Sequence, residues 1–312
     1  MAPAESVEPA LALSGRILVT GASGFAGSHL MRRLGERAVP GDVDVLDADG
    51  VREAIRAERP RAVVHLAAAA SVSQSWNRGA EAWHVNAVGT VNLLDAVAAE
   101  AREARVLAVS TADVYGAAEV VPTPEDAPLA PLSPYGASKA AAELACDRSR
   151  LADGLAVVVT RSFPHLGPGQ DERFAVGSWV LQVARAELAG RGVLQVGDLT
   201  VRRDLLDVRD VVRAYEALLD PGVPVGTYNV ASGRARELHE VVELLVELAA
   251  CTIHVSQDPA RLRSADIPIV CGDASRLAEA TGWSPEIPLE QTLADALDEA
   301  RRAVRTAETA GV

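Results

Sequence analysis

The sequence predicts an α/β protein built on a doubly wound parallel sheet. Short β-branched apolar runs alternate with helix-forming stretches through the first half of the chain, and a glycine-rich turn joins the first run to the first helix. The residues that are informative about function gather where the expected strands end, at 21–27, from 67 onward and at 110–111. Ligands of open α/β sheets bind at the carboxyl ends of the strands. We therefore expect the functional site along that edge.

Length and charge limit the classes of protein that the chain can represent. With 312 residues the chain can bury a large core. Its 30 Lys and Arg residues against 43 Asp and Glu residues give a formal net charge of −13, which repels nucleic acid and anionic membrane surfaces. We expect no nucleic-acid partner and no membrane partner, and an anionic ligand must be met by locally placed arginines.

Cysteine and histidine spacing predicts neither disulfide bonds nor a metal site. The cysteines Cys146, Cys251 and Cys271 are far apart without a CxxC pair, and the six histidines show no HExxH or similar ligand spacing. Residues 1–14 are acidic and contain proline, so a disordered leader is expected there rather than a signal peptide. No apolar run approaches the ~20 residues that cross a bilayer. These features predict a cytoplasmic protein.

The first strand and helix frame a glycine turn. Residues 16–20 form a short apolar run, Gly21, Gly24 and Gly27 follow it, and residues 28–37 favour a helix. In such a turn the first glycine adopts the tight bend, the second lets the backbone approach a diphosphate, and the third lets the helix lie close to the sheet. Placed directly between a strand and a helix, this spacing predicts a dinucleotide site.

The next elements continue the alternation of strands and helices. Residues 42–47 alternate polar and apolar side chains like a half-exposed strand, and a helix is expected over 50–58. A strand over 62–66, a helix over 83–99 and a strand over 106–110 follow.

A helix that carries a tyrosine and a lysine is expected next. Ser133 can cap its amino end, Pro134 suits its first position, and the helix should continue to about Leu151. Tyr135 and Lys139 are four residues apart and therefore share one face. A neighbouring ammonium lowers a tyrosine pKa that is ordinarily ~10, so the pair suits proton transfer. Many solvated helices carry such a pair by chance, so its meaning depends on the other motifs.

The second half of the chain has weaker but regular signals. The expected elements are a strand over 157–161, a loop over 163–170, a helix over 178–189, a strand over 193–196, a helix over 210–219, a strand over 227–230, a helix over 237–250 and a mixed tail over 266–305.

In its motifs the chain resembles the extended short-chain dehydrogenase/reductase family. The glycine turn, HLAA at 65–68, STADVYG at 110–116 and YGASK at 135–139 match in order. Within the family, the stretches at 161–170, 203–204, 266–268, 272–273 and 281–283 are most similar to reductases of nucleotide-linked 4-keto-6-deoxy sugars, the GDP-4-keto-6-deoxy-mannose reductases above all. The resemblance implies a Rossmann-type sheet with a smaller C-terminal α/β substrate-binding domain.

The resemblance also implies domain boundaries and site residues. The NAD(P)-binding domain would cover 15–163, with 204–231 returning to it, and the substrate-binding domain would take 164–203 and 232–305. Tyr135 would act as acid and base, Lys139 would lower its pKa and hold the nicotinamide ribose, and Thr111 would hydrogen-bond the reacting oxygen. The implied cofactor contacts are Gly21, Ser23, Gly24, Phe25, Gly27, Asp47, Ala67, Ala68, Asn86, Tyr135 and Lys139. The implied substrate contacts are Ser71, Asp113, His165, Arg203 and Arg263.

The adenosine end of the cofactor site departs from the family pattern. The segment 35–47 is too short for the usual second strand and a separate third strand. An acid there would favour a ribose 2′-hydroxyl, and an arginine would favour a 2′-phosphate. The candidate acids are Asp42, Asp44 and Asp47, and the candidate arginines are Arg32, Arg33 and Arg37. We expect NADPH, because a reductive step fits it, with NAD as the alternative.

Two further departures lie on the substrate side. Pro164 stands where the family usually has an asparagine near the diphosphate, and Ala69 and Ala70 replace larger polar residues. The substrate is expected to be a GDP- or dTDP-linked sugar. A homodimer that packs through the tyrosine-bearing helix follows by analogy from the family.

The resemblance favours NADPH-dependent reduction of the C4 keto group of a nucleotide-linked 4-keto-6-deoxyhexose. A 4,6-dehydratase or a 4-epimerase with retained NAD is the alternative within the family. A dehydratase needs an additional acid and base; Asp113 could supply one, whereas Ala112 stands where one class has an aspartate. A non-catalytic nucleotide-sugar sensor is the remote alternative, disfavoured by the intact Thr111, Tyr135 and Lys139.

Overall fold

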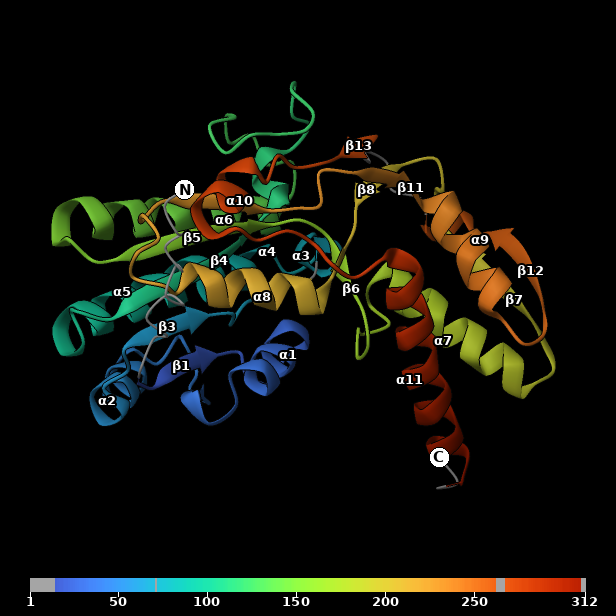
Figure 1. Ribbon diagram of the computed structural model, residues 1–312, viewed down its shortest axis with the longest axis horizontal. Helices are drawn as coiled ribbons and strands as arrows, with labels where there is room; N and C mark the ends of the chain where they lie inside the picture. Colours follow the sequence, from blue (N-terminus) through green and yellow to red (C-terminus); the bar gives the residue numbers. More distant parts are fainter. Residues whose placement is uncertain (1–14, 71, 262–266, 310–312) are drawn as a thin grey trace, which may run out of the picture.

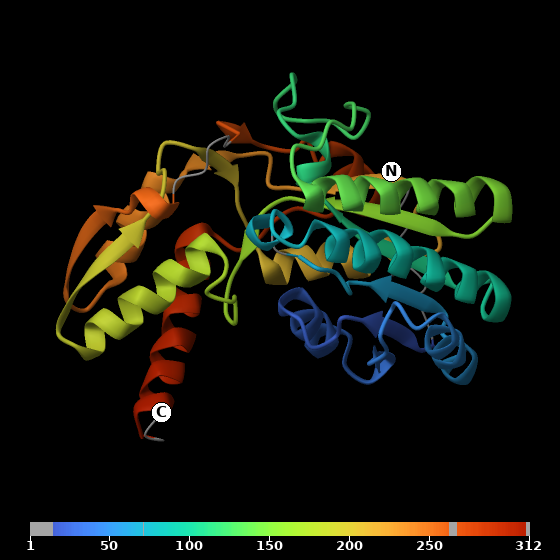
Figure 2. The same ribbon diagram turned by 180° about the vertical axis from the view of Figure 1, so that it is seen from behind.

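The computed structural model describes residues 15–309 apart from residue 71 and residues 262–266. These residues form two lobes, a larger one around a parallel sheet and a smaller one that carries the C-terminal helix (Figure 1). Figure 2 shows from behind how the helices cover the sheet.

The sheet has six parallel strands in the order β10-β5-β4-β3-β1-β2. The doubly wound fold class is thereby confirmed. Most of these strands are apolar runs buried on both faces, as expected for a parallel sheet covered by helices. The strands are β1 Ile17–Thr20, β2 Ala38–Gly41, β3 Ala62–His65, β4 Arg105–Thr111, β5 Val157–Ser162 and β10 Thr227–Val230.

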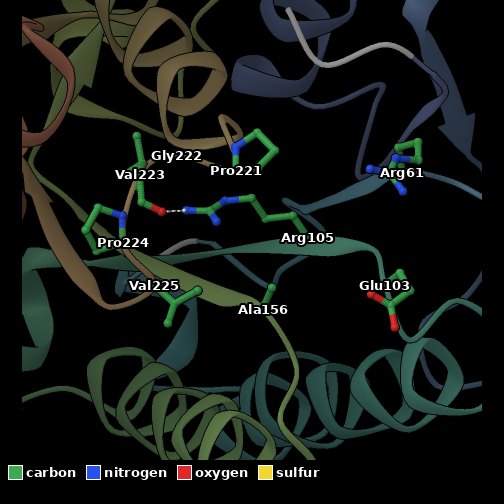
Figure 3. A pocket seen from close by; sticks show the side chains of 9 residues that line it. All are labelled: Arg61, Glu103, Arg105, Ala156, Pro221, Gly222, Val223, Pro224 and Val225. Atoms are coloured by element: carbon green, nitrogen blue, oxygen red, sulfur yellow. Dashed lines mark hydrogen bonds between the residues drawn. The ribbon is translucent and has the colours of Figure 1, made fainter. Parts of the chain in front are cut away.

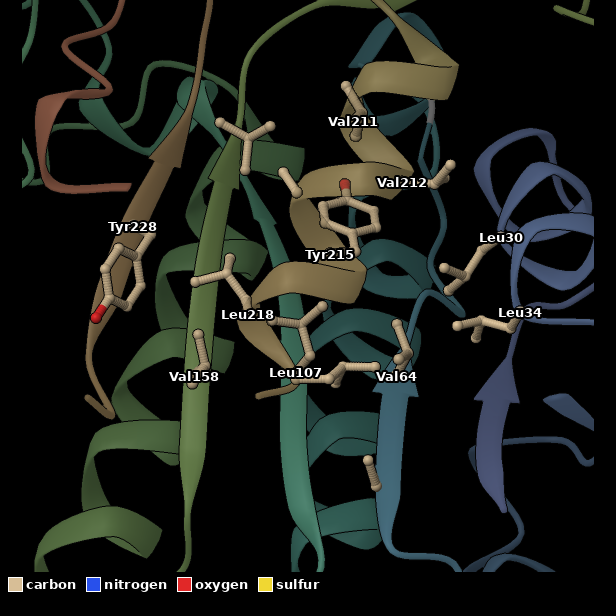
Figure 4. Packing of buried hydrophobic residues seen from close by; sticks show 14 of the residues in the cluster. Leu30, Leu34, Val64, Leu107, Val158, Val211, Val212, Tyr215, Leu218 and Tyr228 are labelled. Atoms are coloured by element: carbon tan, nitrogen blue, oxygen red, sulfur yellow. The ribbon is translucent and has the colours of Figure 1, made fainter. Parts of the chain in front are cut away.

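Each face of the sheet packs against its own helices. On one face lie α2 (Ala48–Glu58), α5 (Gly89–Glu100) and α6 (Pro134–Arg148), whose apolar side chains meet Leu18, Val63 and Val106. On the other face lie α1 (Phe25–Leu34), α8 (Val208–Leu218) and α10 (Ser275–Thr281). Figure 4 shows this second core, where Leu30 and Tyr215 approach Val64 and Leu107. The alternation of side chains along each strand supplies both cores.

The smaller lobe has a separate core. Helices α7 (Ala175–Leu188), α9 (Leu238–Leu248) and α11 (Leu289–Thr309) enclose Trp179, Val183, Leu245 and Leu297. A parallel pair of strands flanks them, formed by β7 (Arg191–Val196) and β12 (Thr252–Gln257). The sequence signals gave no indication of β12.

Short strands connect the two lobes. β8 (Arg202–Asp204) pairs with β11 (Ala235–Glu237) and β13 (Ile269–Val270), and β6 (His165–Leu166) pairs with β9 (Leu206–Asp207). The remaining helical elements are α3 Val72–Ser75, α4 Gly79–Trp83, π-helices at His84–Val88 and Ser149–Asp153, and 3-10 turns at Gly35–Arg37, Ala112–Tyr115 and Pro259–Arg261.

The expected strand over 42–47 is wrong. The second strand is β2, and residues 42–47 form turns instead, with hydrogen bonds from Val43 N to Gly41 O and from Asp47 N to Asp44 O, both 2.9 Å. The alternating pattern arises because Val45 is buried while the aspartates cap local backbone groups. One strand therefore stands between α1 and α2, at the edge of the sheet, which explains why the segment is short.

Segments from the second half of the chain return to the larger lobe. β10 pairs with β5 in the large sheet, and the return of 204–231 to an NAD(P)-binding domain stays a prediction. Leu277 and Trp283 also pack in the core beneath that sheet, so part of the stretch 232–305 contributes to the larger lobe. Among the described residues no helix has both the length and the apolar character needed to span a membrane.

Candidate active site

Helix α6 presents Tyr135 and Lys139 to the carboxyl end of β4. The Ser133 hydroxyl accepts a hydrogen bond from Gly136 N at 2.9 Å and Pro134 occupies the first turn, so the helix begins as its sequence predicts. Tyr135 is 9% exposed and Lys139 is 5% exposed. The Lys139 ammonium donates to the carbonyl oxygen of Val109 at 2.7 Å. The helix is thereby fixed to the strand that ends in Thr111.

Tyr135 lies beside Thr111 and Asp113. Burial raises the pKa of Tyr135, the Asp113 carboxylate adds to the rise, and a hydrogen bond with Thr111 opposes it. The expectation that Lys139 lowers this pKa is not met in the protein alone, because burial outweighs the other effects and the ammonium bonds to Val109 instead. The phenol is therefore protonated at neutral pH and available as a proton donor.

Lys139 is a buried cation with a lowered pKa. Burial lowers its pKa to about 8, while Cys146 and Glu143 act in the opposite direction. Glu143 lies one turn further along the same helix. The ammonium thus retains its charge at neutral pH with Glu143 among the anions that favour it.

The glycine turn is shaped by close backbone approach. Gly21 has a positive φ of 69°, and a side chain there would lie 2.7 Å from the amide nitrogen of Ala67. A side chain at Gly27 would collide with the carbonyl oxygen of Gly21, so helix α1 can lie on the turn only because that residue is glycine. Gly24 caps α1 without a side-chain hydrogen bond, and Ser23 beside it is exposed. The first amide groups of the helix are therefore available to an anion.

Hydrogen bonds join the loop after β3 to Thr20, which precedes the glycine turn, and through Asn86 to α6. The Thr20 hydroxyl accepts from Ala67 N at 3.3 Å and bonds His65 Nδ1 at 2.8 Å. The Asn86 side chain accepts from Ala69 N at 2.9 Å and donates to the Ser138 hydroxyl at 2.9 Å. Ala67, Ala68 and Asn86 thus lie between the glycine turn and the helix of Tyr135, where the sequence placed cofactor contacts. Their binding of a cofactor stays a prediction.

The candidate arginines and the candidate aspartates for the adenosine ribose lie at different edges of the sheet. Arg33 and Arg37, at the carboxyl end of α1 and just beyond it, both pair with Glu216 of α8. Because α1 runs back along the sheet, that end lies away from the carboxyl ends of the strands, and so does Arg32. Asp42, Asp44 and Asp47 follow β2 at the ligand edge. Asp47 caps α2 by accepting from Gly50 N at 3.0 Å.

A buried polar network joins α6 to β4 and β5, and it was not predicted from the sequence. Glu143 accepts hydrogen bonds from Arg161 Nε and Nη2, at 3.1 and 2.8 Å to Oε2, and from the Ser110 hydroxyl. Arg161 also donates to the Tyr115 hydroxyl at 2.9 Å, and Tyr115 donates to Asn229 at 2.7 Å. A glutamate within an alanine-rich helix and an arginine ending a buried strand were the signals that could have indicated it.

The structure separates the expected substrate residues: His165 and Arg203 lie in the short strands β6 and β8, and Asp113 lies beside Tyr135. His165 in β6 is half-buried and stacks on Phe25, with the ring centroids 5.9 Å apart. Arg203 Nη1 donates to the carbonyl oxygen of Ile267 at 2.8 Å. Asp113 lies next to Tyr135, and its amide donates to the Thr111 hydroxyl at 3.2 Å. Ser71 and Arg263 lie outside the described residues.

Figure 3 shows a hollow at the amino ends of β3, β4 and β5, whereas Tyr135 lies near the carboxyl end of β4. Its lining includes Arg61, Ala156 and Arg105, which precede or begin strands, and the loop around Val223. The Arg105 guanidinium donates to the carbonyl oxygens of Leu218 and Val223 at 2.8 and 2.7 Å, so it joins elements of the fold. This hollow holds none of the Thr111, Tyr135 and Lys139 set. Across the described ranges, no group of three or more His, Cys, Asp or Glu side chains is arranged to hold a metal ion.

Comparisons with known proteins agree with this geometry. A family model described as GDP-mannose 4,6 dehydratase matches residues 37–296. A GDP-6-deoxy-D-mannose reductase from Pseudomonas aeruginosa is 39% identical over 302 residues, which cover 93% of this chain and 98% of the relative. A GDP-6-deoxy-D-talose 4-dehydrogenase from Aggregatibacter actinomycetemcomitans is 29% identical over 276 residues, or 86% of this chain and 91% of the relative. The structure of RMD from Pseudomonas aeruginosa complexed with NADPH matches with a TM-score of 0.87 at 37% identity, covering 93% of this chain and 100% of that chain.

The sheet, the glycine turn and the Tyr135–Lys139 pair define the class of the extended short-chain dehydrogenases/reductases. Within this class the chain belongs to the family described by the GDP-mannose 4,6 dehydratase model, and it is similar to GDP-6-deoxy-D-mannose reductase. The resemblance stated from the motifs is confirmed, and the chain is an NAD(P)-dependent oxidoreductase.

Proposed function

We propose that this protein reduces the C4 keto group of a nucleotide-linked 4-keto-6-deoxyhexose with NADPH. The observation that carries the proposal is the buried phenol of Tyr135, which lies beside Thr111 and Asp113 at the carboxyl end of β4 and whose pKa is raised by burial. Reduction of a ketone consumes a proton at the oxygen, and a neutral phenol can donate one. The 39% identity to a GDP-6-deoxy-D-mannose reductase supports the same reaction.

The residues at the strand ends fit a dinucleotide cofactor. The uncapped first turn of α1 offers amide groups to a diphosphate, and Gly21 and Gly27 leave space that a Cβ would fill. The bound NADPH supplies the hydride. Lys139, held by Val109, would contact the nicotinamide ribose, and Asn86 would border the cofactor from the loop side. The 37% identical solved structure that contains NADPH supports this cofactor, with NAD as the alternative.

Tyr135 and Thr111 would share the work at the sugar carbonyl. Thr111 hydrogen-bonds the reacting oxygen and Tyr135 donates its phenolic proton as negative charge grows there. Preorganised donors of this kind contribute roughly 2.7–4 kcal/mol each when the site excludes water. Lys139 stabilises the phenolate that remains. Arg203 and Arg263 would bind the diphosphate of the substrate, since a guanidinium makes charge-assisted bonds to phosphate oxygens.

The remaining parts of the proposal concern partners and assembly. The smaller lobe would bind the nucleotide sugar, with GDP or dTDP as the nucleotide. Exposed apolar side chains on α5 and just after α6, among them Val91 and Leu151, support a homodimer packed through these helices. The net charge of −13 and the cysteine spacing support a cytoplasmic protein without nucleic-acid or membrane partners.

Cofactor consumption tests the proposed reaction against its relatives. Purified protein is incubated with NADPH and a GDP- or dTDP-linked 4-keto-6-deoxy sugar, and absorbance of the reduced nicotinamide is followed. We expect stoichiometric loss of NADPH and a new secondary alcohol in the product. Tightly bound NAD released on denaturation, with no net consumption of NADPH, would instead indicate an epimerase or a dehydratase.

A further inference from the structure

Helix α1 carries a buried histidine for which the proposed reaction has no use. His29 lies one turn after the glycine turn and is 7% exposed. Its Nε2 lies 2.8 Å from the carbonyl oxygen of Pro168, which can only accept, so Nε2 carries the proton. Burial lowers the pKa of His29, and the ring is therefore a neutral donor at neutral pH. Pro168 lies 139 residues away in the chain, in the loop that follows β6.

A second contact joins the same helix to β6, the strand that precedes this loop. Phe25, the first residue of α1, stacks on His165 with centroids 5.9 Å apart and an interplanar angle of 6°. The Phe25 ring also meets the edge of His29, at 5.6 Å and 81°. Helix α1, which follows the glycine turn directly, thus contacts β6 through the stacked rings of Phe25 and His165, and it contacts the loop through the hydrogen bond of His29 to Pro168. Figures 1 and 2 show this loop descending beside α1 between the two lobes.

The loop is fixed in turn to the strands on the substrate side. Gln170 donates to the carbonyl oxygen of His165 at 2.8 Å, and Leu206 N donates to the carbonyl oxygen of Pro164 at 3.0 Å. β6 also pairs with β9, which places His165 opposite Leu206. Leu206 follows the strand β8, where Arg203 stands. A continuous path of packed and hydrogen-bonded groups therefore runs from α1 to the segment that follows the strand of Arg203.

We propose that Phe25, His29 and His165 couple the cofactor site to the sugar-nucleotide site, with His29 as the positioning residue that holds the loop by its bond to Pro168. This inference rests on the proposed function, because it needs a ligand at each site. Binding of the cofactor at the start of α1 favours the loop position in which the substrate strand is correctly placed. Coupling of binding is reciprocal, so a ligand of the substrate site tightens cofactor binding by the same factor.

The coupling factor is measured by titrating NADPH with and without saturating GDP. In the natural chain we expect GDP to lower the NADPH Kd by about 5-fold or more, the lower end of common coupling energies. His29→Ala should bring the ratio of the two Kd values close to one, whereas His29→Gln, whose amide can donate to Pro168, should keep part of it. His239→Ala is the matched control, because His239 is exposed on α9 and should leave the ratio unchanged.

Thermal unfolding shows whether His29→Ala folds. If it does not, Phe25→Leu provides a second disruption that preserves an apolar side chain. Phe25→Leu should also bring the ratio of the NADPH Kd values without and with GDP closer to one, and this ratio does not depend on a change in NADPH affinity itself. A natural chain that binds NADPH and GDP independently, or variants that retain the full ratio, would overturn the coupling and leave the proposed reaction intact. A chain that binds neither ligand would overturn both.

Discussion

The two sides of the active site are built differently. On the catalytic side, Tyr135, Lys139 and Glu143 are buried, and each has its hydrogen bonds or charges supplied by the protein itself. On the expected substrate side, Arg203 is half-buried, and its guanidinium donates to the backbone oxygens of Arg202 and Ile267. In the proposed function, the groups that carry out the chemistry would therefore be preorganised by the fold, whereas Arg203 would bind the substrate from a half-buried position on a short strand.

Removal of the Tyr135 hydroxyl, on the catalytic side, should give the largest loss of activity. Tyr135→Phe deletes the proton donor and keeps the ring in its buried place, so kcat should fall by about 10²–10⁴-fold, the usual share of a general acid. NADPH binding should persist, because the glycine turn and Lys139 are untouched. Steady-state kinetics and a cofactor titration on the same preparation check both statements. Full turnover by the variant would show that the proton comes from elsewhere.

The buried ion pair should contribute strongly to the stability of the catalytic side. Glu143→Gln leaves the Arg161 guanidinium buried without its counter-charge, and we expect the free energy of unfolding to drop by about 3–5 kcal/mol. Denaturant unfolding measures the change. Glu53→Gln removes a partner from the exposed pair with Arg56 and should change stability little.

A double variant distinguishes the cost of the uncompensated charge from the loss of the surrounding hydrogen bonds. Glu143→Leu together with Arg161→Met removes both charges, so it should be less destabilising than Glu143→Gln alone. Equal or greater destabilisation by the double variant would mean that the hydrogen bonds to Ser110 and Tyr115, rather than the uncompensated charge, dominate.

The substrate side should respond through binding rather than through turnover. Arg203→Met removes one charge-assisted contact worth about 1.5–3 kcal/mol, so KM for the sugar nucleotide should rise by about 10-fold or more with kcat nearly unchanged. Arg202→Met is the control, because adjacent residues of a strand point to opposite faces. A loss of kcat in Arg203→Met with an unchanged KM would contradict the division between the two sides.

The smallest expected effect is a pH dependence of the catalytic side. Burial lowers the pKa of Lys139 to about 8, so the ammonium loses its proton above that pH and kcat/KM for NADPH should decline there. Because the Glu143 carboxylate favours the charged form, Glu143→Gln should move the decline to lower pH. A pH–rate profile of both proteins tests the direction. A flat profile well above pH 8 would mean that Lys139 retains its proton there.

Local signals allowed much of the catalytic side to be predicted. The glycine turn and the helix of Tyr135 depend on backbone conformation and capping within a few residues, and both lie where the sequence placed them. The prediction of a strand at 42–47 was wrong, because aspartates that cap local backbone groups alternate with apolar residues as the residues of a strand do. The pKa of Tyr135 was misjudged because spacing along a helix says nothing about burial.

Long-range pairs could not be read from the sequence. Glu143 meets Arg161 across 18 residues, and His29 meets Pro168 across 139, so neither contact leaves a periodic or local pattern. Strand β12 is exposed along most of its length, and its pairing with β7 rather than an apolar pattern makes it a strand. Such features depend on the assembled fold.

The destination of the hydride tests the central proposal most directly. NADPH carrying deuterium at the transferable position of the nicotinamide is mixed with GDP-4-keto-6-deoxy-mannose and the protein, and the product is analysed by NMR. We predict one deuterium at C4 of the sugar for each NADPH consumed. A product without deuterium at C4, or conversion that leaves the NADPH unconsumed, would contradict the account.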